Sequence, residues 1–123
     1  LGNLYKDRNT VKLQDQMPEV PGNFSGKPCW DKSNELLAAG YHTYKDRFVF
    51  SGVGGVFTAE DAYQKIRLGA SLVQMVTGLI FQGPSVPGRI NAGLAELLRR
   101  DGLASVSDAI GVDNVAIKKG KTL

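Results

Sequence analysis

The stretch that decides the fold is residues 48–53, Phe-Val-Phe-Ser-Gly-Val, followed by Gly54-Gly55. Its apolar side chains follow one another with little polar alternation, which is typical of a parallel β-strand that is covered on both faces. Residues 71–76, Ser-Leu-Val-Gln-Met-Val, repeat this pattern, and Thr77-Gly78 closes it. A helical pattern separates the two runs. We therefore predict a β-α-β unit with two parallel strands.

The helix between the strands has clear signals at both ends. Thr58 is a good N-cap, and Asp61 stands three residues later, which is the spacing of a capping box. Gly69 is placed to end the helix. The predicted inner face consists of small and apolar side chains at helical spacing, namely Ala59, Ala62, Tyr63 and Ile66.

Further helices are predicted on either side of this unit. One begins at an N-cap Asp31 and ends near residues 44–46, and another follows Pro87 with an apolar stripe. A short helical turn is predicted within residues 105–111, capped by Ser105 or Ser107. Two strands that are apolar on both faces cannot form a covered sheet alone, so the sequence indicates the end of a larger α/β protein. The repetition favours a barrel over an open sheet.

The two ends of the chain differ from its middle. Residues 1–30 show no persistent helical or strand period, so we predict that they form a long loop at the active site. Residues 112–123 predict a flexible basic tail. The net charge is +3, and Lys118, Lys119 and Lys121 account for all of it. The rest of the chain has no basic field, so nucleic acid is not an expected partner.

Several kinds of chemistry are poorly supported by the composition. Cys29 and His42 are the only cysteine and histidine, so neither an internal disulfide nor a Cys/His zinc site is expected. We interpret Cys29 as a small buried side chain and His42 as a surface or capping residue. The longest apolar runs are far shorter than the roughly 20 residues that span a bilayer.

Glycines at the ends of the two predicted strands suggest a ligand site. Gly52, Gly54 and Gly55 would bring backbone N–H groups to the edge of the sheet where α/β proteins bind ligands. Phe57 stands where the dinucleotide fingerprint requires a third glycine, so that fingerprint is not met. A tight turn and a phosphate site fit the first loop equally well, and Thr77-Gly78 at the neighbouring strand end favours phosphate. Lys27 is either an anion contact or a solvated charge.

Six segments taken in order resemble the C-terminal third of dihydroorotate dehydrogenase. They are residues 24–28 (Phe-Ser-Gly-Lys-Pro), 51–56 (Ser-Gly-Val-Gly-Gly-Val), 60–67, 69–74, 77–84 and 108–111 (Asp-Ala-Ile-Gly). Each motif is modest alone, but their order and spacing are specific. The segments 72–74 and 108–111 are more similar to the quinone-dependent, membrane-associated class 2 enzymes than to class 1.

The resemblance implies a flavoprotein oxidoreductase with an FMN-binding (β/α)8 TIM barrel. Residues 1–123 would form the C-terminal part of that single domain, from about the end of strand six to strand eight. The implied reaction oxidises dihydroorotate to orotate, with FMN as cofactor and a quinone as acceptor, in de novo pyrimidine (UMP) biosynthesis. The implied cofactor-binding residues are Ser25, Gly26, Val53, Gly54, Gly55, Met75, Val76 and Thr77; the implied substrate-binding residues are Asn3 and Leu4.

The resemblance also implies what lies outside this chain. The family's catalytic serine and its membrane-associated helices would lie upstream, so we assign no catalytic residue and no metal here. The remainder of the barrel would come from upstream sequence or a second chain, and the fragment alone is predicted inactive. The parent would be peripheral to the cytoplasmic or mitochondrial inner membrane, and this segment itself soluble. Gly2 and Val76 stand where the family often has Thr and Tyr.

Two other functions remain open on the residues themselves. A non-redox barrel enzyme would use the same loops for a sugar phosphate, and it would be colourless. A non-catalytic fragment would pair its open sheet edge with a partner chain.

Overall fold

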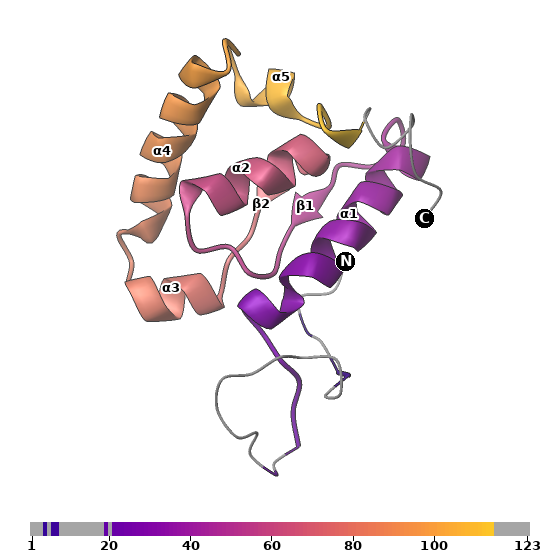
Figure 1. Ribbon diagram of the computed structural model, residues 1–123, viewed down its shortest axis with the longest axis vertical. Helices are drawn as coiled ribbons and strands as arrows, with labels where there is room; N and C mark the ends of the chain where they lie inside the picture. Colours follow the sequence, from indigo (N-terminus) through magenta and orange to yellow (C-terminus); the bar gives the residue numbers. More distant parts are fainter. Residues whose placement is uncertain (1–3, 5, 8–18, 20, 115–123) are drawn as a thin grey trace.

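The computed structural model describes residues 4, 6, 7, 19 and 21–114. In the described part of the chain, a 3-10 turn, η1, precedes the first helix, helices and short strands then alternate as far as α3, and two more helices follow (Figure 1). The elements are η1 (Lys27–Cys29), α1 (Trp30–Tyr44), β1 (Ser51–Gly52), α2 (Ala59–Leu68), β2 (Leu72–Val73), α3 (Thr77–Gln82), α4 (Val86–Arg100) and α5 (Val106–Ala109).

The predicted β-α-β unit is confirmed. β1 and β2 are parallel, with Ser51 opposite Leu72 and Gly52 opposite Val73. Each strand has only two residues, fewer than predicted. Hydrogen bonds extend the pairing slightly at both ends, because the Ser71 N–H donates to the Phe50 carbonyl (2.8 Å) and the Gln74 N–H donates to the Gly52 carbonyl (2.8 Å).

One face of the two predicted strands is exposed in the part of the chain that the structure describes. Val49 is 77% exposed and Leu72 is 62% exposed, although both belong to the apolar runs. The helices that pack on β1 and β2 cover one side, and no described segment covers these side chains. The apolar pattern therefore indicates a larger covered area than this part of the chain provides.

α2 is held by local signals at both of its ends, as predicted. Thr58 Oγ1 accepts from the Asp61 N–H (3.2 Å), and an Asp61 carboxylate oxygen accepts from the Thr58 N–H (3.2 Å), which completes the capping box. Gly69 ends the helix with φ +125°. A Cβ there would overlap the ring of Tyr41 in α1, so glycine also allows α1 and α2 to approach.

The core lies around α2, which occupies the middle of the molecule between α1 and α4 (Figure 1). α4 approaches α2 closely because Gly93 has no side chain; a Cβ there would lie 2.5 Å from the Ala59 Cβ. Two clusters of buried residues form the core, one of Val56, Ala62, Val86 and Ile90, the other of Tyr63, Ile66, Leu98 and Ala109.

The remaining predicted helices are present, with one correction. Asp31 is not the N-cap of α1; Cys29 occupies that position without a side-chain cap, because η1 leads directly into the helix. Pro28 lies within that 3-10 turn. The short turn after α4 is α5, and Ser105 forms a capping box with Asp108.

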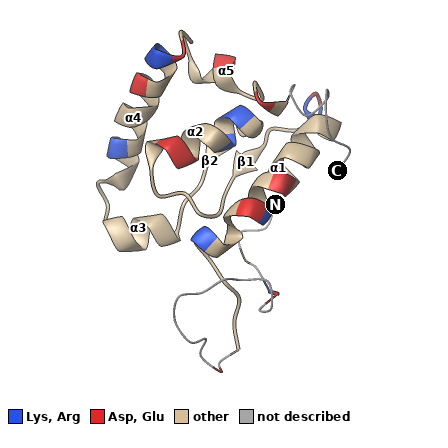
Figure 2. Cartoon of the chain, in the orientation of Figure 1, with Lys and Arg blue, Asp and Glu red and all other residues tan. Residues whose placement is uncertain are grey.

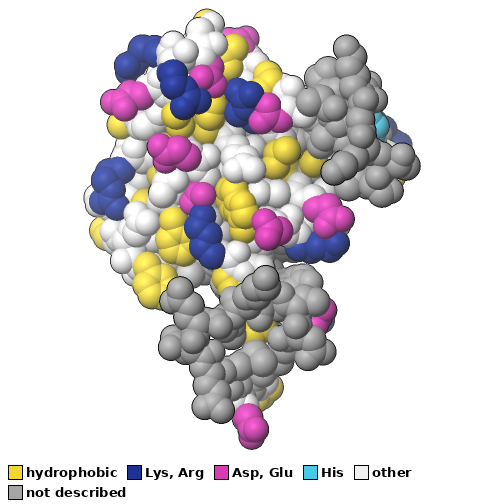
Figure 3. Space-filling model, in the orientation of Figure 1, with side chains coloured by type: hydrophobic (Ala, Val, Ile, Leu, Met, Phe, Trp, Pro, Cys, Tyr) yellow, Lys and Arg dark blue, Asp and Glu magenta, His cyan; other side chains and the backbone are white. Residues whose placement is uncertain are grey.

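α3 is a helix that the sequence did not predict. It begins at Thr77, where we expected only the end of a strand. It carries no charged residue (Figure 2), and its apolar side chains Leu79, Ile80 and Phe81 are exposed. Hydrophobic side chains gather in this region of the surface (Figure 3).

The boundary predicted for the basic tail also needs correction. Asn114 is buried, and its amide nitrogen donates to the carbonyls of Ala38 (2.9 Å) and Leu68 (2.8 Å). Asp113 pairs with Arg67 at 2.6 Å. Residues 112–114 are therefore part of the packed structure, and residues 115–123 lie outside the described range.

Candidate functional site

A small open cavity lies where three turns meet at the carboxyl ends of β1 and β2. It is lined by the segment before η1, the loop between β1 and α2, and the segment that leads into α3. All the residues predicted to bind cofactor line it: Ser25, Gly26, Val53, Gly54, Gly55, Met75, Val76 and Thr77, together with Val56 and Gly78. The structure thus brings together residues that are far apart in sequence, such as Ser25 and Thr77, which are separated by 52 positions.

Glycine is required at three positions of this cavity by conformation and by space. Gly26, Gly54 and Gly55 have φ values of +76°, +95° and +75°. A Cβ on Gly26 would lie 3.0 Å from Thr77 Cγ2, and a Cβ on Gly55 would lie 3.0 Å from Trp30 Cε3. The wall is therefore largely main chain, with no room for extra side-chain atoms.

Two hydroxyl groups connect the first and third turns. Ser25 Oγ and Thr77 Oγ1 are 2.6 Å apart, a hydrogen-bonded pair. Thr77 is also the first residue of α3, and the first N–H groups of a helix have no partner within that helix. The cavity thus offers hydroxyl and main-chain donors but, among the described lining residues, no charged side chain.

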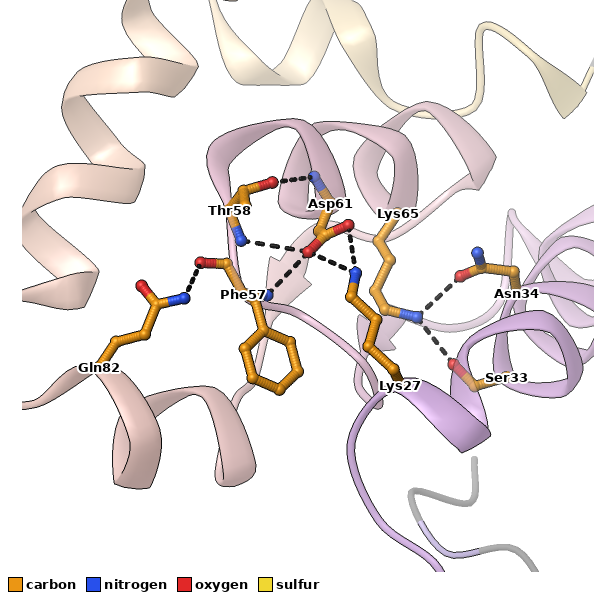
Figure 4. Close-up of polar contacts among 8 residues, drawn as sticks. All are labelled: Lys27, Ser33, Asn34, Phe57, Thr58, Asp61, Lys65 and Gln82. Atoms are coloured by element: carbon orange, nitrogen blue, oxygen red, sulfur yellow. Dashed lines mark hydrogen bonds and ion pairs between the residues drawn. The ribbon is translucent and has the colours of Figure 1, made fainter. Parts of the chain in front are cut away.

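Lys65 is buried behind the wall of the cavity, and the sequence analysis missed it. It projects from α2 toward α1 (Figure 4), and no part of it is exposed. Its Nζ donates to Ser33 Oγ (2.7 Å) and Asn34 Oδ1 (2.7 Å) and lies 4.7 Å from the Trp30 ring centre. Burial lowers the pKa of Lys65 to about 8. One signal in the sequence was available: Lys65 follows Ala62 by three residues, a spacing that places both on the inner face of the helix.

Lys27 is an ion-pair partner, not a cavity residue. Its Nζ lies 2.7 Å from both carboxylate oxygens of Asp61, the residue that also caps α2 (Figure 4). Lys27 Nζ also lies over the Trp30 ring, 4.6 Å from the ring centre. The Lys27 side chain is 52% exposed, so its charge is partly solvated as well as paired with Asp61 within the chain.

The predicted interpretation of Cys29 agrees with the structure. It is buried, and its thiol donates to the Phe24 carbonyl at 3.1 Å. His42 lies exposed in the last turn of α1. No group of three or more metal-ligating side chains occurs within the described residues.

Comparison with known proteins places this geometry in a family. The sequence model of dihydroorotate dehydrogenase matches residues 2–98. The chain belongs to the dihydroorotate dehydrogenase family. The family prediction made from the six sequence segments is therefore confirmed.

Relatives of this family member carry the quinone-type name. The dihydroorotate dehydrogenase (quinone) of Deinococcus deserti is 46% identical over 95 residues, which are 77% of this chain and 26% of the relative. That of Xanthobacter autotrophicus is 43% identical over 113 residues, 92% of this chain and 31% of the relative. The chain therefore spans between a quarter and a third of the length of these dihydroorotate dehydrogenases.

Solved structures of dihydroorotate dehydrogenase share the fold. The ligand-free enzyme of Eimeria tenella matches with a TM-score of 0.81 at 31% identity, over 89% of this chain and 30% of that one. Within the described residues of this chain, no helix has the length and apolar character needed to cross a bilayer.

The two predicted substrate positions are not part of the cavity as described. Asn3 lies outside the described residues. Leu4 is described and is 53% exposed, and it does not line the cavity. Their assignment as substrate-binding residues stays a prediction.

Proposed function

We propose that this chain supplies the flavin-phosphate site of a dihydroorotate dehydrogenase that oxidises dihydroorotate to orotate in pyrimidine biosynthesis and passes the electrons to a quinone. The observation that carries the proposal is the meeting of Ser25-Gly26, Val53-Gly54-Gly55 and Met75-Val76-Thr77 around one cavity. In this proposal the chain forms the segment from about the end of strand six to strand eight of a (β/α)8 barrel.

The donors present fit the phosphate of FMN. A phosphate needs many hydrogen-bond donors and close approach of the main chain, and the glycines at 26, 54 and 55 permit that approach. Ser25 and Thr77 add hydroxyl groups on one side. A bulky side chain at any of the three glycines would fill the cradle.

FMN, when bound, supplies the two-electron redox chemistry that the amino acids lack. The role of this chain is to hold the phosphate end of FMN, and this contact fixes the position of the cofactor relative to residues elsewhere in the protein. Asn3 and Leu4 are proposed to contact dihydroorotate. We assign no acid–base role to any residue here.

The quinone and the membrane enter the proposal through the rest of the protein. We propose that the parent protein associates with the membrane peripherally, through segments outside residues 1–123. Val76 lines the cavity and is also 55% exposed, so its side chain is available to a further segment or to the electron acceptor. The common family residue here is tyrosine, and the smaller valine leaves the backbone donor unchanged.

The test uses the natural gene product that contains this chain. We expect it to purify with bound FMN and to reduce a soluble ubiquinone analogue when dihydroorotate is added. Orotate formation and quinone reduction would be measured together, because equal amounts of the two show that the electrons are transferred. A colourless protein that binds sugar phosphates and leaves dihydroorotate unchanged would overturn the proposal in favour of a non-redox enzyme.

A further inference from the structure

The feature that the proposed function leaves unused is the buried ammonium of Lys65. Long cationic side chains are almost never fully buried unless they serve a partner. Lys65 has none of its surface exposed, and its ammonium donates hydrogen bonds to two neutral oxygens, Ser33 Oγ and Asn34 Oδ1. Replacing such a group by an apolar one is often neutral or stabilising, so stability alone does not account for it.

A hydrogen-bond chain connects Lys65 to the glycine turn of the cavity. Lys65 Nζ donates to Ser33 Oγ at 2.7 Å, and Ser33 Oγ donates in turn to the Val53 carbonyl at 2.5 Å. Val53 is the first residue of the turn, and Gly54 follows it. A Cβ on Gly54 would lie 3.2 Å from the same Ser33 oxygen, so the turn packs directly on this relay.

A second contact path runs through the ring of Trp30. Lys65 Nζ lies 4.7 Å from the ring centre, a distance typical of a cation–π interaction. The same ring packs against the other glycine of the turn, since a Cβ on Gly55 would lie 3.0 Å from Trp30 Cε3. Both glycines of the turn therefore rest on side chains that contact Lys65.

The charges of this cluster favour an anion. Lys27 and Lys65 both lie near Trp30, at 4.6 Å and 4.7 Å from its ring centre, while Asp61 is the carboxylate that pairs with Lys27. Together these three side chains carry one excess positive charge when both lysines are protonated. A bound phosphate would balance this charge, since Lys65 is fully buried behind the turn that lines the cavity.

We propose that Lys65 is a positioning residue for the phosphate of the flavin: through Ser33 and Trp30 it fixes the Val53-Gly54-Gly55 turn and gives the cavity a positive potential. This rests on the proposed function. Lys65 touches no cofactor atom in this proposal, since it does not line the cavity. Its effect is on the ligand's phosphate group and not on the flavin ring.

The test compares two ligands that differ only in the phosphate. Dissociation constants of FMN and of riboflavin are measured by quenching of flavin fluorescence on the apoprotein of the natural gene product. We expect Lys65→Met to weaken FMN binding roughly tenfold or more, the usual scale for losing a charge-assisted contact, while riboflavin binding is unchanged. A merely structural role would weaken both ligands equally.

Three further variants keep the test independent of misfolding. Ser33→Ala retains the lysine and breaks only the relay, so it should also weaken FMN selectively. The double variant should lose little more than Lys65→Met alone, because both act on one path. Arg99→Met removes one positive charge from an exposed site on α4 and should leave both ligands unaffected.

The outcomes separate this inference from the proposed function. If the unaltered protein binds FMN no better than riboflavin, the phosphate site itself is wrong. If it prefers FMN and Lys65→Met keeps that preference in full, the site stands and the role of Lys65 is refuted. Equal weakening of FMN and riboflavin by both Lys65→Met and Ser33→Ala would also refute it.

Discussion

Replacing Gly55 by alanine tests the cavity with the smallest possible change. Gly55 has φ +75°, a conformation that residues with a Cβ rarely adopt. The added methyl group would lie 3.0 Å from Trp30 Cε3, 3.1 Å from Trp30 Cβ and 3.3 Å from the Gly26 carbonyl oxygen. Gly26 belongs to the opposite wall of the cavity, and Trp30 packs against the turn without lining the cavity, so the turn cannot accept the methyl group without moving.

The expected magnitude follows from these two effects. Holding alanine in a left-handed conformation costs about 1–2 kcal/mol. The three close contacts demand shifts of a few tenths of an ångström and add a smaller amount of strain. If the turn moves to relieve a total of about 2 kcal/mol, FMN binding weakens by roughly ten- to thirty-fold. Gly55→Val adds two more methyl groups and should act in the same direction, more strongly.

The assay is the FMN content of the purified natural gene product, followed by the FMN dissociation constant of its apoprotein. Gly102→Ala is the matched control, because Gly102 has a similar φ of +70° and a Cβ there would meet nothing within 4 Å. It should lose about 1–2 kcal/mol of stability through the same backbone strain and keep its FMN affinity.

Two results would refute the reasoning. One is an FMN affinity in Gly55→Ala equal to that of the unaltered protein, which would mean that the turn does not hold the phosphate. The other is an equal loss of FMN in Gly102→Ala, which would mean that general destabilisation, and not the cavity, controls cofactor retention.

Three further predictions concern pH, a buried amide and the isolated chain. Burial lowers the pKa of Lys65 from 10.5 to about 8, so the folded state binds fewer protons above that pH and its stability rises with pH toward 10.5. Chemical unfolding at about pH 7 and about pH 9 should show a gain of about 1 kcal/mol that Lys65→Met lacks; an equal gain in the variant would contradict this. Asn114→Ala should cost about 1–3 kcal/mol, because two carbonyls lose their donor, whereas exposed Asn91→Ala should be nearly neutral in the same unfolding assay. The chain of residues 1–123 alone should not oxidise dihydroorotate, and turnover by chain purified from a host without its own enzyme would show otherwise.

The parts of the fold that the sequence predicts are those with signals inside single elements. The Thr58 capping box and Gly69 bound α2 closely because both ends depend on contacts within a few residues. The apolar stripe of α4 identifies that helix for the same reason. The glycines at the ends of the two strands predicted only a turn or a ligand site there, whereas the individual cavity residues were implied by the resemblance to the family.

The parts that were missed depend on tertiary contacts. α3 begins with β-branched Thr77 and Gly78, has no side-chain cap, and forms where the chain packs against Val56, with no room for a Cβ on Gly78. Lys65 was missed because a lysine is normally placed on the solvated face of a helix. Only the presence of α1, with Ser33 and Asn34, shows that this face of α2 is buried.

The cavity wall has a consequence for how such a protein can diverge. The wall consists largely of main chain, and almost every amino acid supplies the same peptide group. The side chains at Met75 and Val76 can therefore change while the peptide groups stay in place. The freedom ends at Gly26, Gly54 and Gly55, where any mutation adds atoms. Under the proposed function, such a site can adapt the neighbouring surface to a new electron acceptor while it keeps its hold on the flavin phosphate, provided that the three glycines are kept.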